Sequence, residues 1–138
     1  MSHSGRFILI AFTLYQRIGV DIEFIYDVPE INQIAKIILS ENEYYVFKFL
    51  SQEEKIEVFF HYWTRKEAIT KAIGIGLSQP PNSITTSILP GKPASLITLN
   101  GDKKIASSWL VQSLDLDPNY ATALAVEYNE FELKIYHL

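Results

Sequence analysis

Two acidic residues, Asp21 and Glu23, have the types and spacing best suited to chemistry in this sequence. Residues two apart on a strand leave the same face, so their carboxylates would lie side by side. Such carboxylates repel each other unless a cation lies between them, and Mg²⁺ binds carboxylate and phosphate oxygens together. Taken alone, an Asp-x-Glu pair is more often the solvated face of an edge strand. A metal site therefore requires a further ligand.

That further ligand is available on a predicted helix. Ile56, Phe60 and Trp63 follow the spacing of one helical stripe, and the same spacing continues to Glu67 and Lys71. The stripe changes from apolar to charged in its last two turns. One interpretation is a surface Glu67–Lys71 pair, worth only about 0.2–0.5 kcal/mol. Because an acidic pair is available on a strand, we favour a site for Mg²⁺ and phosphate.

Three more charged residues flank this pattern. Ser40 and Glu43 fit the Ser-x-x-Glu pattern of a capping box, in which the glutamate accepts a hydrogen bond from a backbone N–H. Lys66 precedes Lys71 by five residues, which is a rotation of about 140° around a helix. One lysine could therefore meet a phosphate while the other lines a different edge or pairs at the surface. Arg65 is most simply a solvated cation.

Strands and helices must position these groups. We expect strands over 7–13 and 17–24, joined as an antiparallel hairpin. Three helices follow, over 29–39, 40–50 and 51–73. A proline opens the first, Ser-x-x-Glu capping boxes open the other two, and glycines 74 and 76 end the third.

The C-terminal part reads as a meander of five strands, over 84–89, 94–99, 107–114, 122–128 and 131–137. Turn signals separate these strands, and Asn100-Gly101 is a strong hairpin signal. Two strands, three helices and then a strand meander define the α+β class, with an antiparallel sheet packed against the long helix and shorter helices.

Size and composition narrow the possible functions. With 138 residues, 48% of them apolar, we expect one domain, 1–138, that buries roughly two thirds of its unfolded surface. The net charge of −4 argues against a nucleic-acid surface. The apolar run 7–14 is too short to cross a membrane and lacks a small-residue cleavage site after it. The absence of cysteine excludes disulfides and thiol chemistry and is compatible with the cytoplasm.

Four blocks, in this order, resemble the signature segments of the 4′-phosphopantetheinyl transferases. They are Ser-His-Ser-Gly at 2–5, Gly-Val-Asp-Ile-Glu at 19–23, Trp-Thr-Arg-Lys-Glu-Ala-Ile-Thr-Lys at 63–71 and Gly-Ile-Gly-Leu-Ser at 74–78. The resemblance is to the C-terminal half of the larger, surfactin-synthetase-activating type. It implies a phosphopantetheinyl transferase-like fold over the whole of 1–138.

The resemblance also implies a reaction and the residues that carry it. Members transfer the 4′-phosphopantetheine arm of coenzyme A to a serine of an acyl or peptidyl carrier protein and release 3′,5′-adenosine diphosphate. Carried over to this sequence, the Mg²⁺ ligands would be Asp21, Glu23 and Glu67, and the contacts to coenzyme A would be Ser2, His3, Lys66 and Lys71. Bound Mg²⁺ would neutralise charge that develops on the leaving phosphate.

The family pattern gives Glu43 a second interpretation. It matches a candidate general base, which would accept the proton of the carrier serine directly or through water. Glu67 and Lys71 complete the implied catalytic set. The capping interpretation of Glu43 stays open beside this one.

The larger family type has two similar halves with coenzyme A between them, and this sequence begins at the Ser-His-Ser block. We therefore expect a homo-oligomer that completes the cleft, a dimer ahead of a trimer. A truncated chain and a partner polypeptide are the alternatives. A non-catalytic remnant that binds metal or coenzyme A is the competing function. A metal-dependent nuclease is disfavoured, because Glu67 and Lys71 are four apart on a helix and the chain is acidic.

Overall fold

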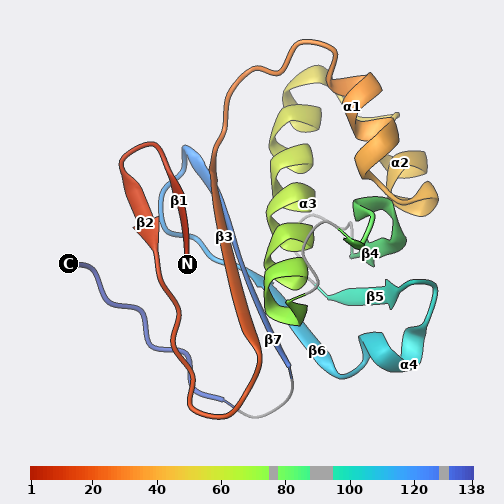
Figure 1. The fold of residues 1–138 in the computed structure, drawn as a ribbon. Coiled ribbons are helices and arrows are strands. Elements are labelled where there is room, and N and C mark those ends of the chain that lie inside the picture. The colour runs from red at the N-terminus through yellow and green to blue at the C-terminus, as the bar shows by residue number, and fades with distance from the viewer. Residues whose placement is uncertain (75–77, 88–94, 128–130) are drawn as a thin grey trace.

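The computed structural model describes residues 1–74, 78–87, 95–127 and 131–138. The elements assigned within these residues are three antiparallel sheets, four α-helices and the 3₁₀ turn Pro81–Ser83. Figure 1 shows their arrangement. In chain order the elements are β1 Ser2–Ser4, β2 Phe7–Leu9, β3 Ile18–Phe24, α1 Ile31–Ile38, α2 Glu41–Phe47, α3 Gln52–Ile73, the 3₁₀ turn Pro81–Ser83, β4 Ile84–Thr86, β5 Leu96–Leu99, α4 Lys103–Ala106, β6 Trp109–Ser113 and β7 Tyr120–Glu127.

The long helix α3 is the middle layer of the molecule. On one side it packs against the three-stranded sheet of order β3-β7-β6, and on the other side it meets α1 and the region of β4 (Figure 1). One apolar cluster joins the C-terminal half of α3 to β6 and β7. A second cluster joins its N-terminal half to α1 and α2. This architecture confirms the expected α+β class.

Close packing of α3 on β3 depends on Gly19. A Cβ atom at this position would lie 2.5 Å from the backbone nitrogen of Ala72 and closer still to the carbonyl oxygen of Ala68. Both atoms belong to the α3 backbone, which has no flexible side chain to move aside. The absent side chain therefore sets how near the helix comes to the acidic residues of β3.

Gly19→Ala should destabilise the fold. Forcing a methyl group against backbone in a packed interface costs about 1–3 kcal/mol. For a chain of this size the melting temperature should fall by at least about 3 °C, measured by circular dichroism. An unchanged melting temperature would show that α3 is not held this close to β3.

Observed caps confirm the starts of the second and third predicted helices, although α2 ends at Phe47 rather than at residue 50. The first helix begins at Ile31, two residues after Pro29, and its N-cap residue Glu30 makes no side-chain cap hydrogen bond. Both Ser40 and Ser51 form complete capping boxes, with Glu43 and Glu54 respectively. Gly74 caps α3 in the left-handed region, with φ of 77°. Residues 75–77 of the Gly-x-Gly-Leu-Ser block lie outside the described residues.

The predicted hairpin between 7–13 and 17–24 is wrong. β2 ends at Leu9 and pairs with β1, while β3 pairs antiparallel with β7 from Ile18–Val126 to Phe24–Tyr120. β3 is buried over four successive residues, since it lies between β7 and the β1 segment and under α3. A local hairpin could not supply that burial, so the long-range pairing prevails.

Three C-terminal expectations also need correction. Residues 131–137 form no strand and are largely exposed. The turn at Asn100 and Gly101 has positive φ at both residues, as a tight hairpin turn requires, but it leads into the short helix α4 rather than a strand. Helix α4 was not predicted. The strands expected over 84–89, 94–99 and 122–128 are shorter or shifted, and 88–89, 94 and 128 lie outside the described residues.

No helix within the described residues is long and apolar enough to cross a membrane.

Candidate functional site

Asp21 is the centre of the acidic site. Its side chain is buried on β3, and its Oδ1 accepts hydrogen bonds from the Ser2 hydroxyl at 2.8 Å and from the Lys71 ammonium at 2.7 Å. The same ammonium donates to the Ser2 oxygen at 3.1 Å. These hydrogen bonds among Ser2, Asp21 and Lys71 therefore connect β1, β3 and α3. Asp21 Oδ2 is buried and has no hydrogen-bond partner among the described residues.

Glu23 lies on the same face of β3, as its spacing from Asp21 predicts. The side chain is half-buried, and it accepts hydrogen bonds from Trp63 and, at 3.5 Å, from the Ser4 hydroxyl. Burial raises the pKa of Glu23, and repulsion from Asp21 raises it further, while the two hydrogen bonds oppose the rise. The positive charge and hydrogen bonds around Glu23 therefore do not fully offset its burial and the repulsion from Asp21.

Glu67 faces both β3 carboxylates from α3. Burial raises its pKa, repulsion from Asp21 and Glu23 adds to the rise, and Lys71 opposes it. The charges of Asp21 and Glu23 both act on the Glu67 carboxylate, so the three acids lie within range of electrostatic interaction. Among the groups that shift the pKa of Glu67, Lys71 is the one that carries a positive charge.

The chemistry of this donor set fits Mg²⁺. All three groups offer hard carboxylate oxygens, and one buried oxygen of Asp21 has no hydrogen-bond partner within the described part of the chain. A divalent cation would relieve the repulsion that raises the two glutamate pKa values. However, the described residues contain no group of three or more acidic or histidine side chains already close enough to hold a metal ion. The donors are suitable and neighbouring, but they do not form a closed cage.

The N-terminal Ser-His-Ser segment contributes to the site through its serines. Ser2 and Ser4 lie on one face of β1 and contact Asp21 and Glu23. His3 lies between them and is exposed. Strand alternation directs it to the opposite face, away from the carboxylates.

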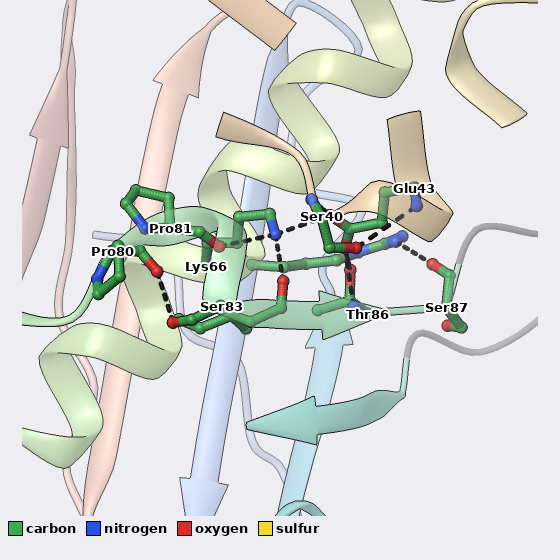
Figure 2. Close-up of polar contacts among 10 residues, drawn as sticks. Ser40, Glu43, Lys66, Pro80, Pro81, Ser83, Thr86 and Ser87 are labelled. Atoms are coloured by element: carbon green, nitrogen blue, oxygen red, sulfur yellow. Dashed lines mark hydrogen bonds and ion pairs between the residues drawn. The ribbon is translucent and has the colours of Figure 1, made fainter. Parts of the chain in front are cut away.

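Lys66 does not join the acidic site. Its side chain is 1% exposed, and its ammonium donates to Glu43 Oε2 at 2.7 Å, to the Pro81 carbonyl at 3.0 Å and to the Ile84 carbonyl (Figure 2). These three acceptors use every N–H of the ammonium. Burial lowers the pKa of Lys66, and the nearby Glu43 opposes that shift. The expectation that Lys66 contacts a phosphate is therefore wrong for this conformation.

Glu43 occupies the other side of this ion pair, and its side chain is fully buried. Oε2 also accepts from the Ser40 backbone at 2.9 Å, and Oε1 accepts from the backbone and the hydroxyl of Thr86 at 2.8 and 3.2 Å. The capping role is confirmed. A carboxylate enclosed in this way does not reach a substrate, so the geometry favours the cap over the base.

Arg65 is also less exposed than expected. Its guanidinium donates to the Ser113 hydroxyl at 3.0 Å and to the Ser87 carbonyl at 2.9 Å. Burial lowers its pKa. Arg65 therefore ties α3 to β6 and to the end of β4, and it is not a solvated cation.

Ser4 and Trp63 were missed as partners of Glu23 by reasoning from the sequence. A weak signal existed for Ser4, because it is two residues from Ser2 and must share its strand face. Trp63 was assigned only to the apolar stripe, although its indole N–H is a hydrogen-bond donor. Both residues orient a carboxylate and do not carry charge.

An apolar cavity adjoins the acidic site. It has a volume of about 240 Å³ and lies between α1, α3 and the end of β3. Glu23 and Trp63 are shared between the cavity and the acidic site, and the other lining residues are Tyr26, Val28, Ile34, Ile38, Phe59 and Phe60. A ligand held at the carboxylates would therefore have apolar surface beside it.

The family of the chain follows from a comparison with known proteins. A family model described as the 4′-phosphopantetheinyl transferase superfamily matches residues 17–125. This range covers most of the chain and contains all three clustered carboxylates and Lys71. The chain belongs to the 4′-phosphopantetheinyl transferase superfamily.

Curated relatives support the same family. The chain is 32% identical to the 4′-phosphopantetheinyl transferase HetI of Nostoc sp. over 137 residues, which is 99% of this chain and 54% of HetI. It is 31% identical to the 4′-phosphopantetheinyl transferase psf-1 of Bacillus pumilus over 124 residues, covering 90% of this chain and 50% of that protein. The chain thus spans about half the length of the curated relatives it matches.

A solved structure of similar fold is the holo-acyl-carrier-protein synthase of Thermotoga maritima. It superposes with a TM-score of 0.61 and 24% identity, covering 82% of this chain and 63% of that one. At this identity the likeness establishes the fold alone. The same holds for the Chronobacterium ammoniagenes ACPS–CoA complex, with a TM-score of 0.53, 18% identity and coverage of 85% and 100%.

Proposed function

We propose that this chain transfers the 4′-phosphopantetheine group of coenzyme A to a serine of an acyl or peptidyl carrier protein, in a Mg²⁺-dependent reaction. The observation that carries this proposal is the buried Asp21, which interacts with Glu67 and Lys71 and has one oxygen without a hydrogen-bond partner among the residues that the structure describes. Membership of the superfamily supports the reaction class. The name of one structural neighbour includes coenzyme A, which supports the co-substrate.

In this proposal Asp21, Glu23 and Glu67 hold Mg²⁺ against the pyrophosphate of coenzyme A. The bound ion supplies charge neutralisation for the pyrophosphate and the leaving group. Ser4 and Trp63 orient Glu23 by hydrogen bonds. The half-buried carboxylates need such support, because a ligand that rotates freely gives no fixed metal geometry.

Lys71 and Ser2 are proposed to bind phosphate oxygens. The Lys71 side chain is 36% exposed, so its ammonium can reach a ligand while it stays near Asp21. His3 lies on the opposite face of β1, and we propose that it contacts a different phosphate group of coenzyme A from the one at Lys71 and Ser2. The charge-assisted hydrogen bonds of an ammonium to phosphate are among the stronger polar contacts available to a protein.

The transfer forms one bond and breaks one. The carrier serine oxygen attacks the phosphorus that bears the pantetheine arm, and the bond from that phosphorus to the bridging pyrophosphate oxygen breaks. 3′,5′-Adenosine diphosphate leaves. We assign acceptance of the serine proton to Glu67, directly or through water, because Glu67 is partly exposed while Glu43 is enclosed.

The apolar cavity gives the pantetheine arm a place beside the site. The arm is bonded to the pyrophosphate of coenzyme A and carries, near that bond, a carbon with two methyl groups. Glu23 and Trp63 border both the carboxylate cluster and the cavity. A ligand phosphate at the carboxylates would therefore present the start of the arm to the cavity.

We propose that the chain works as a homo-oligomer, with a dimer ahead of a trimer. Ile8 of β2 and the residues Ile10, Phe12 and Leu14 of the irregular segment after it are 69%, 52%, 88% and 87% exposed. Such a concentration of exposed apolar side chains favours a partner surface. A strictly monomeric chain at micromolar concentration would contradict this.

The remaining partners follow from charge and composition. The net charge of −4 gives no basic surface for nucleic acid, and we propose neither a nucleic-acid nor a membrane partner. We place the reaction in the cytoplasm, where a carrier protein and coenzyme A meet and a chain without cysteine needs no oxidising compartment.

Calorimetric titration with coenzyme A tests the proposed site. Binding should be clearly tighter with Mg²⁺ than with EDTA, since a cation held by Asp21, Glu23 and Glu67 would offset their repulsion of the pyrophosphate. Equal affinity under both conditions would contradict the metal site. Tight Mg²⁺-dependent binding without transfer to several carriers would instead favour the competing function, a remnant that binds coenzyme A.

A further inference from the structure

A buried ion pair behind the acidic site has no part in the proposed chemistry. Glu43 of α2 and Lys66 of α3 are 0% and 1% exposed, and their charged atoms are 2.7 Å apart. Figure 2 shows the pair between the start of α2, the 3₁₀ turn and β4. Two charges this far from water cost free energy unless every donor and acceptor is satisfied.

Every donor and acceptor of the pair is satisfied. Lys66 donates to Glu43 and to the carbonyls of Pro81 and Ile84. Glu43 accepts from Lys66, from the Ser40 backbone and twice from Thr86. The pair thus fixes α3 at once to α2, to the 3₁₀ turn and to β4. A single rotation of α3 about its axis would break all of these contacts.

Lys66 and Glu67 are neighbours on that helix. Consecutive helical residues point about 100° apart, so the direction of Lys66 determines the direction of Glu67. While Lys66 is held on the side of α2 and β4, Glu67 faces the β3 carboxylates, and Lys71 follows one turn later. We propose that Glu43 and Lys66 are positioning residues, which set the rotation of α3 and thereby aim Glu67 and Lys71 at Asp21. This inference relies on the proposed function in one respect, which is that the acidic site holds Mg²⁺.

Trp63 reports the rotation of α3 without any ligand. Its side chain donates to Glu23 across the interface between α3 and β3. The indole N–H resonance of Trp63, distinguished from that of Trp109, therefore changes whenever α3 rotates away from β3. This signal exists whether or not the chain binds metal.

A double-variant series tests the proposal. Glu43→Gln and Lys66→Met each leave one buried charge unpaired, which should shift the Trp63 indole signal and weaken Mg²⁺ binding by about 10-fold to 100-fold. The double variant removes both charges, so both the indole signal and the Mg²⁺ affinity should return close to the wild-type values. The exposed pair Glu41→Gln and Lys36→Met is the matched control and should change neither readout.

Other results would overturn the proposal. If the double variant folds but keeps a displaced indole signal or weak Mg²⁺ binding, the charges act in some other way. Lower melting temperatures with an unmoved indole signal would show a purely stabilising pair.

One further variant and one further comparison cover the cases in which the single variants do not fold or the chain binds no Mg²⁺. Should the single variants fail to fold, Glu43→Asp keeps the charge but withdraws the carboxylate, and it should still move the indole signal. An unmoved signal in folded Glu43→Asp would contradict positioning. Should the wild-type chain bind no Mg²⁺, the proposed function fails, while the indole signal still decides whether the pair positions α3.

Discussion

Replacing Glu67 with glutamine should abolish transfer of phosphopantetheine while leaving the fold intact. The substitution keeps the shape of the side chain but removes the charge that, in the proposal, holds Mg²⁺ against the pyrophosphate. Losing one metal ligand from a site that stabilises a developing charge should slow transfer by at least about 100-fold. The rate is measured as the mass gained by an apo carrier protein over time.

Stability provides the second readout for Glu67→Gln. Burial and the neighbouring acids raise the pKa of Glu67, so its ionised form is less favourable in the folded chain than in the unfolded chain. A raised carboxylate pKa means that stability falls as pH rises through the range between the unfolded and folded pKa values. Above that range the neutral glutamine should raise the melting temperature of the metal-free chain.

Glu53→Gln is the matched control, since Glu53 is exposed in the first turn of the same helix. It should change neither transfer nor the effect of Mg²⁺. Near-normal transfer by Glu67→Gln at saturating Mg²⁺ would refute the assigned role. A lower melting temperature in the absence of metal would mean that Glu67 is already stabilised by a partner.

Lys71→Met should separate metal binding from coenzyme A binding. The ammonium now lies 2.7 Å from Asp21 Oδ1, so its removal leaves three carboxylates uncompensated and should strengthen Mg²⁺ binding. Coenzyme A binding should weaken by about 10-fold or more, because one charge-assisted hydrogen bond to phosphate is lost. Calorimetry with each ligand measures both changes.

Salt gives this prediction a further signature. Added salt screens a partly exposed ammonium, so the difference in coenzyme A affinity between wild type and Lys71→Met should shrink as salt increases. Lys104→Met removes the same charge from an exposed residue of α4 and should have little effect. If both affinities stay unchanged in Lys71→Met, the lysine pairs only with Asp21 and contacts no ligand.

The parts of the fold that local rules control could be predicted from the sequence. Capping boxes at Ser40 and Ser51 located two helix starts, and Gly74 located the end of α3. The two-residue spacing of Asp21 and Glu23 correctly placed both carboxylates on one strand face. In these cases the determining contacts lie within a few residues of each other along the chain.

Pairing over long distances could not be predicted in the same way. β3 pairs with β7, a hundred residues later in the chain, and no local pattern distinguishes that partner from β2. The pattern over 131–137 suggested a strand, but strand propensity forms no sheet without an edge to pair with. Tertiary context decided both cases.

Within the site, the prediction for Lys66 differs most from the structure, because the side chain is buried against Glu43. The sequence stripe through Ile56, Phe60 and Trp63 suggested one buried face of α3, with Lys66 outside it. The helix instead packs between the sheet on one side and α1 and β4 on the other, so residues on two sides are buried. A lysine can occupy such a position only if an acid meets it, and Glu43 comes from a separate helix.

Transfer by the wild-type chain itself tests the central claim most directly. The purified chain, with its assembly mass measured at the same concentration, is incubated with coenzyme A, Mg²⁺ and apo carrier proteins, and the carriers are weighed by mass spectrometry. The proposed function predicts a gain equal to one phosphopantetheine group with Mg²⁺ and none with EDTA. No gain on any carrier, from a chain that binds coenzyme A and Mg²⁺, would contradict transfer and leave a binding protein.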